Sequence, residues 1–217
     1  MEISASLVKD LREKTGAGMM DCKKALAECG GDFVKAEEWL RKKGIAKAGS
    51  KEGRVAAEGI IATYVHSGRI GAIVEVNCET DFVARNPDFQ DLVKDVAMQV
   101  AAANPKFVRR EEVPTENQDK EKEIQRELLK QQGKPEAMLD KILVGKMEKY
   151  YEQVCLVDQL WVKDDKKKVG EMITERSAKI GEKVSVRRFV RYEVGEGIEK
   201  KKDDLAAEVA KTLGTSA

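Results

Sequence analysis

The sequence predicts an α+β fold, in which helices accompany a small sheet that contains a β-hairpin. Apolar residues recur at helical spacing over roughly the first 45 residues. From Ala57 to Asn77, and again from Lys183 to Val194, apolar and polar residues alternate as they do in strands with one buried face. A polar, highly charged segment with helical spacing lies between these two regions, from about Thr115 to Gln153.

The N-terminal region is predicted to form a small bundle of three short helices. The first helix ends at Gly16, and the second spans Met19 to Cys29. The third begins after Asp32, a good N-cap, and ends before Gly44. The apolar residues expected to pack in the bundle are Leu7, Val8, Leu11, Met19, Cys22, Ala25, Leu26, Phe33, Ala36 and Leu40. Residues 46–54 contain two glycines and mixed charges, so we interpret them as a linker.

The core begins with two strands and a long helix. The strands Gly59–His66 and Arg69–Asn77 are joined by Ser67-Gly68, a two-residue connection suited to a hairpin. Val74 and Val76 are expected to face the core. A helix follows, with Asn86 as its cap and Pro87 in its first turn, and its apolar spacing continues to Asn104.

Residues 115–153 predict an antiparallel helical hairpin that turns at Gly133-Lys134-Pro135. Its apolar stripe is narrow, so we expect the hairpin to project from the body. The residues expected in this stripe are Ile124 and Leu128 on the first helix and Leu139, Ile142, Leu143, Met147 and Tyr150 on the second. A helix over 169–179 and a strand over 183–194 follow, and a last helix covers 198–213. The apolar residues expected on one face of that strand are Val184, Val186, Val190, Tyr192 and Val194, with Phe189 on the opposite face.

The composition excludes several classes of function. The 217 residues include 40 Lys and Arg and 39 Asp and Glu, so the net charge of +1 lacks the basic excess of a dedicated nucleic-acid binder. The basic runs at 166–168 and 200–202 each adjoin an acidic pair, and we interpret them as solvated surface. No apolar stretch approaches the roughly 20 residues of a membrane span, and the N-terminus lacks the pattern of a signal peptide. We expect a cytoplasmic protein that binds neither membranes nor nucleic acid directly.

Little in the sequence points to catalysis or to metal binding. The only histidine is His66, and the sequence contains no nucleotide-binding loop, nucleophile elbow or metal-ligand cluster. The four cysteines form no CxxC pair, so we expect reduced, partly buried thiols at Cys22, Cys29, Cys78 and Cys155. We therefore expect no catalytic residue, no metal and no cofactor, and a function that depends on contact with a partner.

The connection from the second strand to the capped helix carries the most specific motif. Residues 76–86 read VNCETDFVARN, which resembles the signature of the elongation factor Ts family. Two further segments are similar to this family, Thr15–Leu26 and Arg188–Gly197. Because the three segments lie in separate regions, the resemblance covers essentially the whole chain.

The resemblance implies a fold that agrees with the pattern of elements. It comprises an N-terminal three-helix module of the ubiquitin-associated type with its linker (1–54), an α+β core with an antiparallel sheet (55–197) and a C-terminal helix (198–217). The core includes the protruding helical hairpin, at about 115–153. Longer members of the family carry two similar core halves, whereas this chain has one. A homodimer could supply the second half across a two-fold axis, and the helical hairpin is a rival dimerisation element.

The resemblance also implies an activity, guanine-nucleotide exchange on elongation factor Tu. The residues that match the family's intruding motif are Thr80, Asp81, Phe82 and Val83, which would enter the partner's GTPase domain near its magnesium site. Phe82 would act as a wedge, Asp81 would disturb the polar network around the metal, and Thr80 and Val83 would hold the turn. In the alternative interpretation, Phe82 folds back into the core and Asp81 caps a short turn.

The N-terminal module is implied to contact the same GTPase domain. The loop residues that would make this contact are Gly16, Gly18, Met19 and Met20. The alternative is that both methionines pack inside the helical bundle.

Two other classes of function remain open from the sequence. The three-helix module alone could mark an adaptor that binds peptides or proteins without acting on nucleotide state. A thiol enzyme would pair Cys78 with His66, and it would lose activity when Cys78 is replaced by serine.

Overall fold

The computed structural model describes residues 3–15, 17–49 and 53–198. The predicted α+β class is confirmed within these ranges, as are the three N-terminal helices. Gly16 lies outside the described residues, and so does the predicted C-terminal helix beyond Ile198.

The N-terminal module consists of α1 (Ala5–Thr15), α2 (Met19–Glu28) and α3 (Phe33–Gly49). Their facing sides form a small separate core of Val8, Leu11, Cys22, Ala25, Leu26, Ala36 and Leu40, much as the helical spacing predicts. The predicted end of the third helix at Gly44 is wrong, because α3 continues to Gly49. A single glycine weakens a helix by only about 1 kcal/mol. At Gly44, the missing side chain lets α3 approach α8, since a Cβ there would lie 3.3 Å from that of Ala178.

The core sheet has the strand order β1-β2-β5, and both pairs are antiparallel. Its strands are β1 (Glu58–His66), β2 (Ile70–Cys78) and β5 (Ser185–Glu193). The hairpin between β1 and β2 turns at Ser67 (φ 50°) and Gly68 (φ 67°). Positive φ at both central residues is typical of the tight turn whose twist matches that of the two strands, so the hairpin predicted from Ser67-Gly68 is confirmed.

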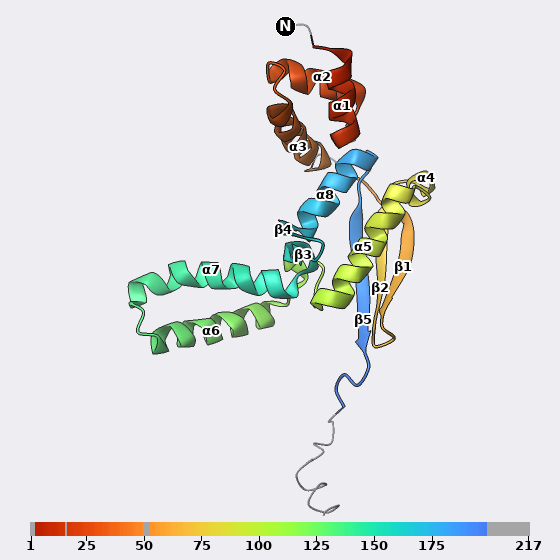
Figure 1. Cartoon of the computed structure of the whole chain (residues 1–217). Coiled ribbons are helices and arrows are strands. Elements are labelled where there is room, and N and C mark those ends of the chain that lie inside the picture. The colour runs from red at the N-terminus through yellow and green to blue at the C-terminus, as the bar shows by residue number, and fades with distance from the viewer. Residues whose placement is uncertain (1–2, 16, 50–52, 199–217) are drawn as a thin grey trace, which may run out of the picture.

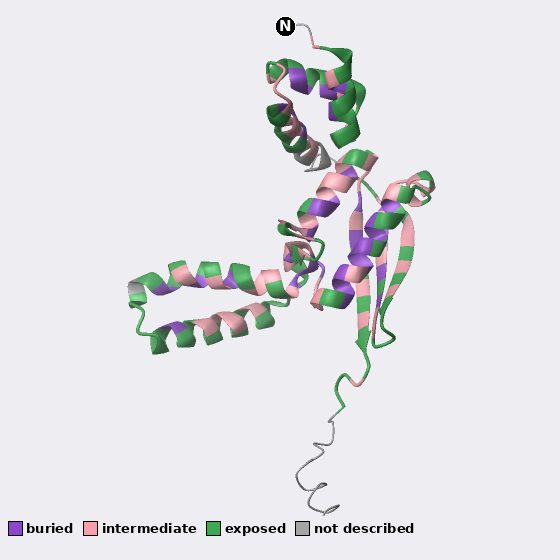
Figure 2. Ribbon diagram, in the orientation of Figure 1, coloured by how far each residue is buried: buried purple, intermediate pink, exposed green. Residues whose placement is uncertain are grey.

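One face of the sheet is covered by α5 (Pro87–Ala103), with α8 (Val169–Ile180) packed beside α5. The Asn86 side chain caps α5 by accepting a hydrogen bond from the Asp88 N–H at 2.8 Å, as predicted. Buried residues concentrate between this helix and the sheet (Figure 2). The buried centre includes Val74, Val76, Phe89, Leu92, Val93, Val96, Val100, Met172 and Val186.

The predicted apolar face of β5 is wrong for the residues after Arg187, because the strand contains a β-bulge there. Glu75 pairs with Arg188 and the next residue, Val76, pairs with Val186, so Arg187 is an extra residue. One extra residue reverses which side chains face the core. Val186 is buried before the bulge, whereas beyond it Phe189 packs on the core. The apolar residues beyond the bulge that lie on the outer side are Val190 and Tyr192, and Val194 just after the strand is also exposed.

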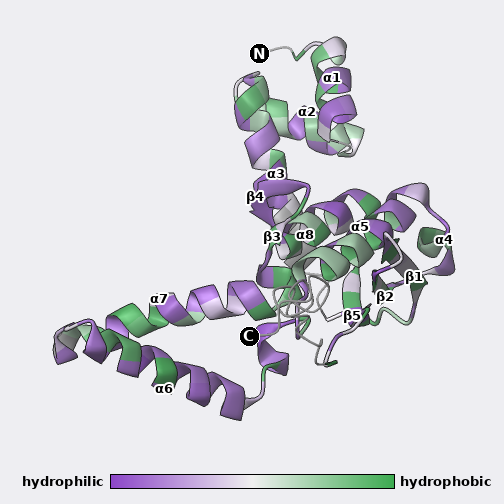
Figure 3. Ribbon diagram, turned by 60° about the horizontal axis from the view of Figure 1, so that its bottom comes forward, coloured by the Kyte–Doolittle hydropathy of each residue, from purple (hydrophilic) through white to green (hydrophobic). Residues whose placement is uncertain are grey.

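The predicted helical hairpin is formed by α6 (Thr115–Gln131) and α7 (Glu136–Val154), and it projects from the body (Figure 1). Most of its surface is exposed and α6 is largely hydrophilic (Figures 2 and 3). The predicted stripe of α6 is wrong, because Ile124 and Leu128 are exposed while the neighbouring Leu129 is buried. Leu129 shares the inside of the hairpin with buried Leu139, Leu143 and Met147 of α7.

Arg110 anchors the base of the hairpin. It lies in the short helix η1 (Arg110–Glu112), and its guanidinium bonds both carboxylate oxygens of Glu148 on α7 at 2.7 Å. The same group contacts Asp158 at 2.6 Å, in the short helix η2 (Leu156–Asp158). It also lies 4.8 Å from the ring centre of Tyr151.

A second, two-stranded sheet was not predicted. It pairs β3 (Leu160–Trp161) with β4 (Asp164–Lys168), so the basic run 166–168 lies in a strand. Two of its lysines form ion pairs, Lys167 with Glu175 at 2.7 Å and Lys168 with Glu152 at 2.9 Å. Over the described ranges, no helix is both long and apolar enough to cross a membrane.

Candidate functional site

The motif between β2 and α5 forms a single helical turn, α4 (Asp81–Ala84). Thr80 is its N-cap, and the Thr80 hydroxyl accepts a hydrogen bond from the Val83 N–H at 3.4 Å. The turn brings together all four residues predicted from the family motif, and we refer to Thr80–Val83 as the TDFV turn.

The TDFV turn presents Phe82 to solvent. The Phe82 side chain is 80% exposed, which contradicts the alternative in which it folds back into the core. Val83 points the other way and packs against the core. Asp81 is partly exposed and forms an ion pair with Arg85 at 3.0 Å. An exposed phenylalanine on a short, capped turn is available for contact with another molecule.

The TDFV turn is tied to a segment far away in the sequence. Glu182, just after α8, accepts hydrogen bonds from the N–H groups of Glu79 and Thr80 at 3.1 and 3.0 Å, and from the Thr80 hydroxyl at 2.7 Å. In return, the Glu79 carboxylate accepts the Lys183 N–H at 2.6 Å, and it lies 3.2 Å from the Arg54 guanidinium.

Cys78 does not have the surroundings of a catalytic thiol. Its buried thiol donates a hydrogen bond to the Thr80 carbonyl at 3.2 Å. Burial raises the pKa of Cys78 to about 11, and the nearby Glu182 carboxylate adds to the shift, so the thiol is protonated at neutral pH. Cys78 pairs with Glu58 at one end of the hairpin and His66 pairs with Ile70 at the other, eight positions along the strand and therefore about 27 Å away. The Cys78–His66 enzyme interpretation is wrong.

The loop before α2 lies in the N-terminal module, at a distance in sequence from the TDFV turn. Gly18 is the N-cap residue of α2, with an extended backbone. Met19 and Met20, in the first turn of α2, are 50% and 76% exposed, so neither packs inside the bundle as the alternative interpretation requires. The fourth residue predicted for this contact, Gly16, is not among the described residues.

Comparison with known proteins accounts for nearly the whole chain. Residues 48–196 match the family model described as "Elongation factor TS", and residues 1–49 match "Elongation factor Ts, mitochondrial, N-terminal". A protein named elongation factor Ts from Myxococcus xanthus (strain DK1622) is 88% identical over 213 residues, which are 98% of each chain. The chain belongs to the elongation factor Ts family. Proteins with the same name from Anaeromyxobacter dehalogenans (strain 2CP-C) and Alkaliphilus oremlandii (strain OhILAs) are 61% and 55% identical, again over 98% of this chain.

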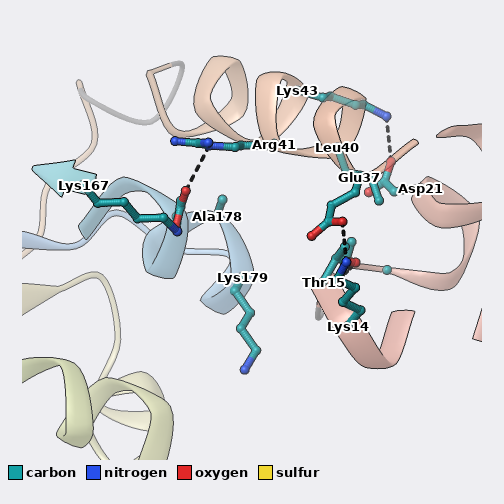
Figure 4. A pocket seen from close by; sticks show the side chains of 14 residues that line it. Lys14, Thr15, Asp21, Glu37, Leu40, Arg41, Lys43, Lys167, Ala178 and Lys179 are labelled. Carbon is teal, nitrogen blue, oxygen red and sulfur yellow. Dashed lines mark hydrogen bonds and ion pairs between the residues drawn. The ribbon is translucent and has the colours of Figure 1, made fainter. Parts of the chain in front are cut away.

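The two parts matched by the elongation factor Ts models meet where α3 packs on α8. The Arg41 guanidinium of α3 lies 3.1 Å from Glu175 of α8, and Gly44 lies against Ala178. A pocket of about 400 Å³ opens beside this contact (Figure 4). Most of the charges that line it pair with one another, such as Lys14 with Glu37 and Lys43 with Asp21, each at 2.7 Å.

Within the described residues, no group of three or more His, Cys, Asp or Glu side chains is arranged to hold a metal ion.

Sequence reasoning missed the residues that hold the TDFV turn in place. Glu79 lies inside the family motif, and this position is the one sequence signal that links it to the site. Glu182 follows Gly181, which ends α8, and it belongs to no sequence motif and to no periodic apolar pattern. Its role depends on a contact between residues 102 positions apart, which periodicity along the chain cannot reveal.

Proposed function

We propose that this member of the elongation factor Ts family is a guanine-nucleotide exchange factor for elongation factor Tu. It binds the GDP-loaded and the nucleotide-free partner, and it promotes GDP release by disturbing the partner's Mg²⁺ site, so that GTP can bind. In this role the protein makes no covalent bond and needs no cofactor, metal or direct contact with nucleic acid. It acts in the cytoplasm, where translation elongation takes place.

The observation that carries this proposal is the exposure of Phe82 at the tip of a turn whose backbone is fixed. A protein accelerates nucleotide release only if it binds more tightly to the partner conformation that holds nucleotide weakly. An aromatic side chain that fills a slot present only in the opened GTPase would provide this preference. A buried aromatic anchor is commonly worth about 2 kcal/mol or more on truncation.

The neighbours of Phe82 have complementary roles in the proposal. Asp81 brings a carboxylate to the partner's metal site, where GDP is held through loop N–H groups and Mg²⁺. Its ion pair with Arg85 is on the surface and therefore weak enough to exchange for new partners. Thr80 caps the turn, and Val83 fastens it to the core.

The N-terminal module provides a second contact in the proposal. Met19 and Met20 are exposed and flexible apolar side chains suited to a protein interface, and Gly18 leaves the adjoining backbone open. The family models change at residues 48–49, and the module has a hydrophobic core of its own. Both observations support a boundary between the module with its linker (1–54) and the core (55–197).

The outer face of the sheet supports a homodimer. Across the strands, Thr63 pairs with Ile73 and Ile73 with Val190 in one row, and Val65 and Tyr192 flank Gly71 in the next. These apolar side chains, together with Ile61, are exposed although they lie side by side. A two-fold contact requires a surface that complements itself, and an apolar sheet face meets this requirement.

The experiment that tests the exchange function is release of labelled GDP from elongation factor Tu in the presence of the purified protein. The wild-type protein should accelerate release. Phe82→Ala should reduce this acceleration by about tenfold or more, because the variant loses the aromatic anchor. Its thermal unfolding should match wild type, since the removed side chain is exposed.

The matched control is Val144→Ala, which shortens another exposed apolar side chain, on α7. It should leave GDP release at the wild-type rate. If Phe82→Ala released GDP as fast as the wild-type protein, the wedge role of Phe82 would be wrong.

A further inference from the structure

We infer that Glu182 is a positioning residue for nucleotide exchange, because it holds the TDFV turn in the orientation that exposes Phe82. The inference rests on the proposed exchange function, and it adds a residue from outside the recognition motif. Glu182 lies in the sequence 102 residues after Thr80, in the connection between α8 and β5.

Both carboxylate oxygens of Glu182 are directed at the start of the turn. One oxygen accepts the consecutive backbone N–H groups of Glu79 and Thr80, at 3.1 and 3.0 Å. The other accepts the Thr80 hydroxyl at 2.7 Å. Hydrogen bonds to an ionised acceptor are about twice as strong as neutral ones. One side chain therefore fixes the backbone where β2 ends and α4 begins.

The Thr80 hydroxyl transmits this constraint into α4. A hydroxyl has one hydrogen to donate, and Thr80 donates it to Glu182. A lone pair is then left to accept the Val83 N–H at 3.4 Å, which is the capping bond of α4. Glu182 therefore determines both the position of the Thr80 hydroxyl and the direction in which its accepting lone pair points.

Glu182 is itself held firmly. Gly181 ends α8 in a left-handed conformation with φ 93°, and the Glu182 carbonyl accepts the Ser177 hydroxyl of α8 at 2.5 Å. The next N–H, that of Lys183, returns a bond to the Glu79 carboxylate at 2.6 Å. Residues 79–80 and residues 182–183 therefore donate hydrogen bonds to each other. These bonds hold the TDFV turn against the C-terminal end of α8, which is a rigid element.

This arrangement matters for binding because the Phe82 ring is 80% exposed and points away from the core. Its direction is set by the backbone of the turn. A turn that is already ordered loses less conformational entropy when it enters a partner. Removing Glu182 should loosen the turn and weaken exchange without removing any group that contacts the partner.

The first test is amide hydrogen exchange, measured by NMR on the isolated protein. In Glu182→Ala, the amides of Glu79, Thr80 and Val83 should exchange about tenfold faster or more, because the charge-assisted bonds of the first two amides are lost and the cap on the third is weakened. The amide of Val96, in the middle of α5, should be unchanged. Glu182→Gln keeps the length of the side chain and one acceptor oxygen, so it should show an intermediate effect, and it carries the test if the alanine variant does not fold. Glu127→Gln, on the exposed face of α6, is the matched control.

The second test is GDP release from elongation factor Tu with the same variants in the presence and absence of Phe82→Ala. Glu182→Ala should slow release about tenfold when Phe82 is present and add little when Phe82 is already replaced. A general folding defect would slow both backgrounds equally, and that result would overturn the positioning role. Unchanged amide exchange in both Glu182 variants, or wild-type GDP release by both, would overturn it as well.

The two proposals can fail separately. If the wild-type protein did not accelerate GDP release, the proposed exchange function would be wrong, while the amide measurement would still decide whether Glu182 holds the turn.

Discussion

The surroundings of a side chain in this protein determine whether it is available to a partner or kept unreactive. Phe82 and Phe89 are seven positions apart, but one is exposed at the tip of a turn, whereas the other lies in the first turn of α5 and is fully buried. Cys78 and Cys155 are both buried, and burial raises the pKa of each thiol to about 11. The exposed aromatic side chain is available to a partner, whereas the two thiols are kept protonated and unreactive.

The buried thiols predict a loss of stability in alkali. Below about pH 9 the thiols are protonated in both the folded and the unfolded chain, so they do not affect the balance. Between about pH 9 and pH 11, the unfolded chain releases these protons more readily than the folded chain does. The free energy of unfolding should therefore fall as the pH rises through this window.

Denaturant unfolding of wild type and Cys155→Ala at several pH values from 7 to about 10.5 measures this effect. The variant should be less stable at pH 7, because a buried side chain is shortened, but its stability should fall less steeply above pH 9. Equal slopes for the two proteins would show that Cys155 does not contribute.

At the scale of elements, α8 connects the two regions proposed to contact the partner. The N-terminal module packs on α8 through Arg41 and Gly44 of α3. Glu182, the residue after the C-terminal cap of α8, holds the TDFV turn. The angle between module and turn therefore depends on how closely α3 packs on α8. At Gly44 the backbone of α3 comes close to α8, because a Cβ there would lie 3.3 Å from that of Ala178.

Two helical glycines provide a matched test of this contact. A Cβ at Gly145 of α7 would have no atom within 4 Å beyond its own turn of helix, so Gly145→Ala should stabilise the protein by about 0.5–1 kcal/mol through the better helix propensity of alanine. Gly44→Ala should gain less or lose stability, because its Cβ would meet that of Ala178 at 3.3 Å. Thermal or denaturant unfolding compares the two variants, and equal gains would mean that α3 can move away from α8 at no cost.

Local patterns predicted several elements closely, because the interactions that form them lie within a few residues. The Asn86 cap and Pro87 define the start of α5, and Ser67-Gly68 defines the hairpin turn. The choice between Leu128 and Leu129 could not be made in this way. Both are apolar neighbours on α6, and only the position of α7 determines which of them is buried.

For the whole molecule, the outer face of the sheet predicts self-association. Ile73 lies at the centre of that face, between Thr63 and Val190. Ile73→Asp should convert a dimer to a monomer, because association would bury an unpaired charge. Light scattering coupled to size-exclusion chromatography measures the mass of the protein in solution.

The matched control is Val144→Asp on the helical hairpin, which should leave the dimer intact. If Val144→Asp separated the subunits and Ile73→Asp did not, the hairpin would be the dimerisation element.

The sequence by itself determined the α+β class, the order of the longer helices and of the three strands of the core sheet, the family motif and its location between a strand and a capped helix. These depend on periodicity, capping and turn residues, whose energetics are local. The tertiary structure decided that Phe82 faces solvent, that the Arg187 bulge turns Tyr192 outward, and that Glu182 holds the turn. Each of these outcomes depends on contacts between segments about a hundred residues apart, which form only when the chain has folded.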